Sequence, residues 1–64
     1  GETTMRLYTL HELIRLSRAE LFALHARITR ELAAMLPASP DRPVAEANLR
    51  NISRVLSRYE IELL

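Results

Sequence analysis

Two short segments, "TLHE" at residues 9–12 and "SRAE" at residues 17–20, constrain the fold more than any other feature of the sequence. Both have the form S/T-x-x-E, the capping box in which the hydroxyl and the carboxylate each accept a hydrogen bond from a backbone amide at the start of a helix. Because the two helix starts lie so close together, we expect a short first helix over about residues 10–16. The second helix then begins at about residue 18, after a sharp change of direction.

Prolines delimit the rest of the chain. The second helix is expected over about residues 18–36, because Pro37 follows it, and "PASPDRP" forms the loop. Either Ser39 caps the third helix, with Pro40 at its first position, or Asp41 caps it, with Pro43 just inside.

The third helix should continue to about residue 60. Residues 3–8 alternate weakly in polarity, but a lone strand would have no partner within this chain, so we interpret them as an extended arm.

One face of the third helix is an apolar stripe with the spacing 4-3-4-3-4, which is typical of a packing seam. Its members are Ala45, Leu49, Ile52, Leu56, Tyr59 and Leu63. At about 100° per residue, Arg50, Arg54 and Arg58 lie on the opposite side. We call these three residues the arginine row and expect them to face solvent, with Glu46 able to pair with Arg50.

The second helix carries two adjacent apolar stripes, wide enough for two neighbours. The first consists of Leu21, Leu24, Ile28, Leu32 and Met35, and the second of Phe22, Ala26, Ala33 and Leu36. We therefore expect the second helix to be central, with the third packed antiparallel on one side and the first on the other.

The predicted fold is all-α: an antiparallel helical hairpin plus a short N-terminal helix, forming a three-helix mini-bundle. The predicted divisions are an arm over residues 1–8, a single domain over residues 9–60 and a tail over residues 61–64. With 64 residues and no cysteine, such a domain has no disulfide or thiolate zinc site and needs tight packing or a partner. No apolar run approaches the roughly 20 residues of a membrane span, so we expect a cytoplasmic protein with no membrane partner.

The sequence shows no pattern for catalysis. "HELIR" begins like the zinc-binding box H-E-x-x-H, but Arg15 stands where the second histidine ligand would be. His11 and His25 are the only histidines, and His25 falls within the apolar stripe of the second helix, where we expect a packed core residue. Since nucleophile motifs and glycine-rich phosphate loops are also missing, we expect no enzymatic activity, cofactor or metal.

The arginine row has three interpretations: a solvated face, a protein contact or a grip on nucleic-acid phosphates. All nine basic residues are arginines, which suits bidentate contacts at interfaces. The formal charge of only +1 and the eight acidic residues argue against nucleic acid. A ribbon-helix-helix dimer, with residues 3–8 as the ribbon and Arg6 reaching bases, remains an alternative.

Apolar residues outside the expected seam favour binding to another protein, because aromatic side chains and arginines are enriched at the centres of interfaces. The predicted apolar anchors are Leu7, Tyr8, Phe22 and Ile61, together with Tyr59 from the seam itself. The arginine row would add charge complementarity and specificity.

The stretches "MRLYTLHELIRLSRAEL" and "SPDRPVAEANLRNISRVLSR" resemble short helical proteins of rhizobial mobile elements, in particular the small quorum-sensing antiactivators of integrative and conjugative elements. The likeness covers about residues 5–58, and the final "YEIELL" has no counterpart in it. It implies a cytoplasmic protein that sequesters transcriptional activators, including a LuxR-type quorum-sensing regulator, and so keeps transfer of the element off. No functional residue is carried over from the family.

The expected function is therefore that of a small regulatory protein that binds and sequesters a transcriptional activator. Two alternatives remain, a DNA-binding regulator of the ribbon-helix-helix kind and a helical bundle that completes its core by self-association, for example as a homodimer.

Overall fold

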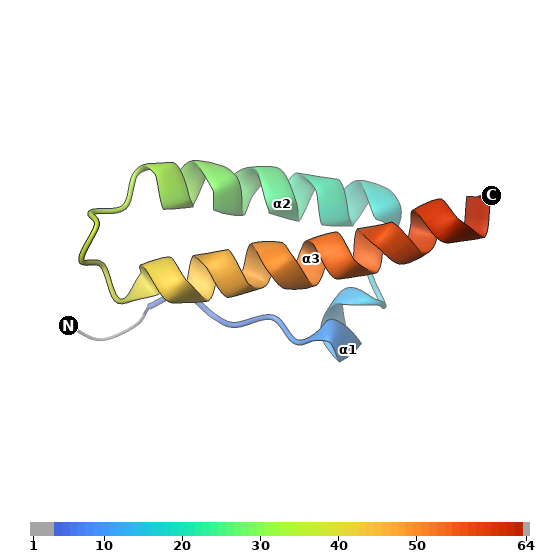
Figure 1. Ribbon diagram of the computed structural model, residues 1–64, viewed down its shortest axis with the longest axis horizontal. Coiled ribbons are helices and arrows are strands. Elements are labelled where there is room, and N and C mark those ends of the chain that lie inside the picture. Colours follow the sequence, from blue (N-terminus) through green and yellow to red (C-terminus); the bar gives the residue numbers. More distant parts are fainter. Residues whose placement is uncertain (1–3, 64) are drawn as a thin grey trace.

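The computed structural model describes the backbone of residues 4–63 and the side chains of residues 4–60. It contains three helices, α1 (Leu10–Leu13), α2 (Arg18–Ala33) and α3 (Asp41–Leu63), and no strand within the described residues. Helices α2 and α3 form an antiparallel hairpin, and α1 with the N-terminal arm lies along the other flank of α3 (Figure 1). This confirms the predicted all-α fold, a helical hairpin with a short N-terminal helix.

Both capping boxes are formed as predicted. Thr9 Oγ1 accepts from Glu12 N at 3.2 Å while Glu12 Oε1 accepts from Thr9 N at 3.1 Å, and Ser17 and Glu20 make the same exchange at 3.1 and 2.9 Å. The hydrogen bonds from the backbone of Thr9 and Ser17 hold the pKa values of the Glu12 and Glu20 carboxyls below their usual range. These two exchanges fix where α1 and α2 begin.

The helix ends differ from the predicted ones. Helix α1 ends at Leu13 and α2 at Ala33, each about three residues early, because the following amides bond to carbonyls three residues back, as Leu16 N does to Leu13 O and Met35 N to Leu32 O. Helix α3 runs to Leu63 rather than ending at about residue 60.

The start of α3 favours the first of the two predicted caps. Ser39 Oγ accepts from Asp41 N at 3.2 Å, which leaves the Asp41 carboxylate for another partner.

The core lies where the predicted seam of α3 meets α2. Ala45 and Ile52 are fully buried, Leu49, Leu56 and Tyr59 are half-buried, and the arginine row is exposed, as predicted. Burial of an aliphatic side chain such as Ile52 stabilises a fold by roughly 1.5–3 kcal/mol. The buried apolar residues are Leu13, Leu21, Ile28, Ala45, Ile52 and Val55.

The central helix is α3, not α2, which corrects the prediction. Helix α3 packs against α2 on one side and α1 on the other (Figure 1). The second predicted stripe of α2 has no helix on it: Phe22 and Leu36 are 49% and 77% exposed, and Ala26 and Ala33 are exposed as well.

The reason is a second inward stripe on α3, beside the predicted seam. It includes the buried Asn48 and Val55 and the half-buried Asn51, and two of these three side chains are polar. A search for apolar periodicity therefore does not detect this stripe.

The extended arm is held on α3 by side-chain amides. Asn48 Oδ1 accepts from Tyr8 N at 2.8 Å, Asn48 Nδ2 donates to Arg6 O at 2.9 Å, and Asn51 Nδ2 donates to Tyr8 O at 3.0 Å. These amides replace the partner strand that an extended segment needs for its backbone hydrogen bonds. Residues 4–8 of the arm form no helix or strand and pack into the same body as the helices.

The other end of the arm is fixed at the start of α3. The Asp41 carboxylate accepts from Thr4 N and Met5 N at 2.7 and 3.0 Å and from the Thr4 hydroxyl at 2.6 Å. Together these hydrogen bonds, with that from Met5 N first among them, hold the pKa of Asp41 below its usual range.

Among the described residues, no helix is both long enough and apolar enough to cross a membrane.

Candidate partner-binding surfaces

The predicted partner-binding residues do not form one continuous surface. Arg58 and Tyr59 line a hollow between α1 and α3, whereas Phe22 borders a groove between α2 and α3. Tyr8 and Leu7 lie in the arm, and the side chain of Ile61 lies outside the described residues.

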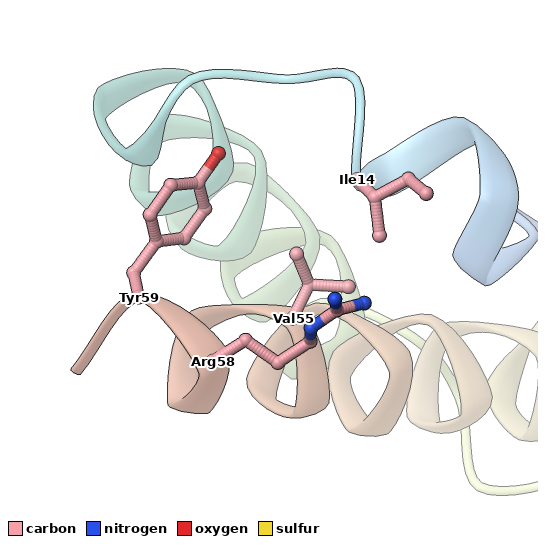
Figure 2. Close-up of a pocket in the computed structure, with 4 residues that line it drawn as sticks. All are labelled: Ile14, Val55, Arg58 and Tyr59. Atoms are coloured by element: carbon pink, nitrogen blue, oxygen red, sulfur yellow. The ribbon is translucent and has the colours of Figure 1, made fainter. Parts of the chain in front are cut away.

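The hollow between α1 and α3 brings together Ile14, Val55, Arg58 and Tyr59, and we call it the α1–α3 hollow. Figure 2 shows Ile14 pointing from the end of α1 toward Val55, with the Arg58 guanidinium lying beside Val55. Its volume is roughly 270 Å³. Ile14 is 45% exposed and Leu10, one helical turn earlier, is 40% exposed. Ile14 therefore lies next to the exposed Arg58, and Leu10 is a second exposed apolar side chain on α1.

Tyr59 fixes the geometry of this hollow. Its hydroxyl donates to Leu16 O at 2.8 Å, which ties the α1–α2 turn to the C-terminal half of α3. Leu13 is fully buried, and because α1 has only four residues, Ile14 beside it is left at the surface. The polar function of Tyr59 is thus satisfied within the fold, while its ring forms part of the hollow (Figure 2).

Sequence reasoning missed Leu10 and Ile14. Their spacing of four residues places them on one side of α1, but the sequence analysis assigned no role to the apolar residues of the short first helix. The shortness of this helix was the available signal, because a helix of one turn can point only one side chain into the core and leaves its other apolar residues exposed.

The arginine row lies exposed along α3. The ion pairs among residues 4–60 are Arg6–Glu12 and Arg27–Glu31, so the expected Glu46–Arg50 pair is not formed. Arg50 and Arg54 border a shallow depression with Leu49, Asn51 and Ser53. Arg58 alone of the row adjoins the α1–α3 hollow.

Tyr8, by contrast, is used by the fold. Its hydroxyl accepts from Arg27 Nη2 at 3.1 Å, and the Arg6 guanidinium lies 4.3 Å from the ring centroid. The hydrogen bond to Tyr8 is the main cause that raises the pKa of Arg27. Leu7, the next residue in the arm, is 52% exposed.

The groove between α2 and α3 is the second candidate surface. It is lined by Phe22, His25, Ser53, Leu56, Ser57 and Glu60, and we call it the α2–α3 groove. The Arg18 guanidinium lies 5.5 Å from the centroid of the Phe22 ring. We predicted His25 to be a core residue, but it is half-buried at this groove. The Thr29 hydroxyl donates to His25 O at 2.8 Å and lies 3.5 Å from His25 Nδ1.

Within the described residues, no group of three or more His, Cys, Asp or Glu side chains is placed to hold a metal ion. Comparisons with protein-family models, curated proteins and solved structures find no match to this chain. What the described surface offers is contact area, with apolar side chains flanked by guanidinium groups.

Proposed function

We propose that this protein is a small non-enzymatic regulator that binds a transcriptional activator and sequesters it. The observation that carries the proposal is the α1–α3 hollow, where Ile14, 45% exposed, lies beside Arg58. An apolar centre with arginine at its edge has the composition of a protein interface rather than of an ordinary solvated surface.

The arginine row extends this surface along α3. Guanidinium groups in a row attract an acidic surface over a distance of about one Debye length, roughly 8 Å at physiological salt. Such charges raise the association rate and select the partner more than they raise affinity. The partner would therefore present an apolar projection for the hollow and carboxylates for the row.

The resemblance to antiactivators of rhizobial mobile elements suggests the class of partner, a LuxR-type or related activator in the cytoplasm. Binding of this protein would cover surface that the activator needs for DNA binding, dimerisation or polymerase contact. The activator would then be held in an inactive complex.

The ribbon-helix-helix alternative has less support. A ribbon requires free backbone groups in the arm to pair with a second chain, but the backbone groups of Arg6 and Tyr8 are bonded to Asn48 and Asn51.

The test is a gel shift of a purified LuxR-type activator on its promoter DNA, with and without this protein. The wild-type protein should abolish the shift, and Ile14→Ser should need at least about ten times more protein to do so, because burying a side chain of this size is worth over 1.4 kcal/mol. Arg58→Ala should weaken inhibition more at low salt than at high salt. Phe22→Ser, of similar exposure but outside the hollow, is the matched control.

An unchanged inhibition by Ile14→Ser would contradict the assignment of the hollow. If this protein alone shifts the DNA with a steep salt dependence, the DNA-binding alternative holds instead.

A further inference from the structure

The arm over residues 4–8 lies in a channel with one wall on α3 and the other on α2. The α3 wall consists of polar side chains that form hydrogen bonds to the arm. The α2 wall supplies the Arg27 guanidinium, which donates to the Tyr8 hydroxyl at 3.1 Å, and the buried Ile28. We call the following wall residues together the arm channel: Arg27, Ile28, Met35, Asp41, Asn48 and Asn51.

The polar wall bonds mainly to backbone groups of the arm. Asn48 accepts from Tyr8 N and donates to Arg6 O, and Asn51 donates to O of the same tyrosine. Asp41 accepts from two successive amides at the start of the arm. Backbone amides and carbonyls are common to all peptides, so these bonds recognise the conformation and register of a segment, as in the recognition of peptides by an added strand.

The positions of the acceptors on α3 suit a stretched peptide. Asp41 and Asn48 are two helical turns apart, which is about 10.5 Å at a rise of 1.5 Å per residue. They accept from the amides of Met5 and Tyr8, and the three residues between these amides span about 10 Å when the chain is stretched. Helix α3 therefore presents its acceptors at the spacing of a peptide that runs parallel to it.

The channel also selects side chains at two positions of the arm. Met5 and Tyr8 are half-buried and pack against the core. The other residues of the arm that the structure describes are exposed. Of these, Thr4 bonds to the α3 wall with its side chain, a hydroxyl that donates to the carboxylate at 2.6 Å. The pattern that fits the channel is therefore a hydroxyl residue, an apolar residue, two residues of any kind and a tyrosine.

The arm leaves part of the channel unfilled. An open cavity of roughly 230 Å³ lies between the arm and α2, with Met5, Ile28 and Met35 on its border. A segment with a larger apolar residue than Met5 would fill more of this cavity and bury more apolar area than the arm does. Asn48 is fully buried and makes its bonds to the arm, so water would reach its amide if the arm left. Another segment can therefore take the place of the arm.

We propose that the arm channel is a binding site for a peptide segment of a partner protein, and that the arm is its intramolecular occupant. The partner segment has the pattern of the arm and lies in the register of residues 4–8. Because the arm is tethered to the channel, it competes with the segment at an effective concentration on the order of millimolar. The apparent affinity for the segment is reduced to the extent that the arm occupies the channel, so the arm is autoinhibitory.

Fluorescence anisotropy of a labelled synthetic peptide, ETTMRLYT, tests the proposal; its sequence is that of residues 2–9. Tyr8→Ala in the full chain weakens the arm and leaves the channel walls intact, so this variant should bind the peptide about tenfold tighter than wild type or better. Leu7→Ser, at an arm residue that is 52% exposed, is the matched control and should bind like wild type. Circular dichroism shows whether each variant keeps its helices, and Thr4→Ala combined with Met5→Ser replaces Tyr8→Ala if it does not.

Methylation of single backbone nitrogens in the peptide tests the register without altering the protein. A methyl group on the nitrogen of Tyr8 removes the donor to Asn48 and should weaken binding to the arm-weakened chain about tenfold or more. Among residues 4–60, Leu7 N makes no hydrogen bond, so a methyl group there is the matched control and should have a much smaller effect. Replacing Met5 of the peptide by Phe should tighten binding about threefold or more, because the ring fills the cavity.

Two outcomes overturn the proposal. The first is an arm-weakened chain that keeps its helices and binds the peptide no better than wild type does. The second is an equal loss of affinity from the two methyl groups, which would place the peptide elsewhere on the protein. The activator hypothesis is tested separately, because Ile14→Ser and Arg58→Ala change residues of the α1–α3 hollow and should leave the affinity for the peptide unchanged.

Discussion

The two sides of the α2–α3 hairpin differ in what covers them. On one side the arm is held by directional hydrogen bonds: Asn48 and Asp41 accept from its backbone amides, and Asn51 donates to one of its carbonyls. On the other side, no described segment covers the α2–α3 groove, and Phe22 remains half exposed. The first side is closed by polar groups that fit one segment only, and the second presents side chains that any apolar surface can contact.

The polar side is therefore specific for one segment, whereas the apolar side can contact many different surfaces. A buried amide must find both a donor and an acceptor, so Asn48 positions the arm at a single register. The stabilisation gained by burying apolar surface is proportional to the buried area and does not depend on the direction of the contact. The arm side is therefore closed within the fold, while the α2–α3 groove and the α1–α3 hollow remain exposed.

The largest expected effect is on the arm side. Asn48→Ala should lower the free energy of unfolding by roughly 2–4 kcal/mol, because it leaves Tyr8 N and Arg6 O without partners and opens a cavity. Urea unfolding measures this loss. The half-buried Asn51, which makes one bond to the arm, is the control: Asn51→Ala should cost about 1 kcal/mol. Equal losses for the two variants would mean that Asn48 does not hold the arm as described.

A smaller effect is expected where α3 meets the α1–α2 turn. Tyr59→Phe removes the hydroxyl that donates to Leu16 O at 2.8 Å and should cost about 1 kcal/mol, measured by the same unfolding experiment. Tyr8→Phe removes a bond to the exposed Arg27 and should cost less. The reverse order would show that the arm, rather than the turn, depends on a tyrosine hydroxyl.

The attachment of the arm to Asp41 should depend on pH. Since the folded-state pKa of Asp41 lies below its usual range, the ionised carboxylate contributes stability above the unfolded pKa of about 3.9. That contribution is lost as the pH falls through the lower, folded-state pKa. The melting temperature of wild type should therefore exceed that of Asp41→Asn at pH 7, and the difference should shrink toward pH 2.

Glu12 and Glu20 have pKa values lowered in the same way, so both proteins should lose stability in acid. Only the difference between the two melting temperatures reports on Asp41. A difference that is constant from pH 7 to pH 2 would assign its effect to something other than charge.

The smallest effect on folding is expected at the α2–α3 groove. At concentrations where the chain is monomeric, Phe22→Ser should change the free energy of unfolding by no more than about 0.5 kcal/mol. The adjacent Leu21 is fully buried, and Leu21→Ala should cost about 2–5 kcal/mol. Similar losses for the two neighbours would place Phe22 in the core and remove the contrast between the two sides.

Much of this architecture was predictable because its causes are local. A capping box depends on four consecutive residues, so Thr9 and Ser17 identified both helix starts. The seam of α3 depends on spacing along one helix, so the burial of Ile52 and the exposure of Arg54 followed from the sequence. The all-α fold and the antiparallel hairpin followed from the same local signals together with one short loop.

Only the tertiary structure decided which helix is central, where the arm lies and which residues meet at the α1–α3 hollow. Asn48 is separated from Tyr8 by 40 residues, and an asparagine on a helix is equally compatible with solvent and with burial until the chain supplies a donor and an acceptor for it. Ile14 and Arg58 likewise meet only because Tyr59 ties the α1–α2 turn to α3. Periodicity within one helix determines which faces are apolar, but the choice of what covers each face depends on contacts between distant segments.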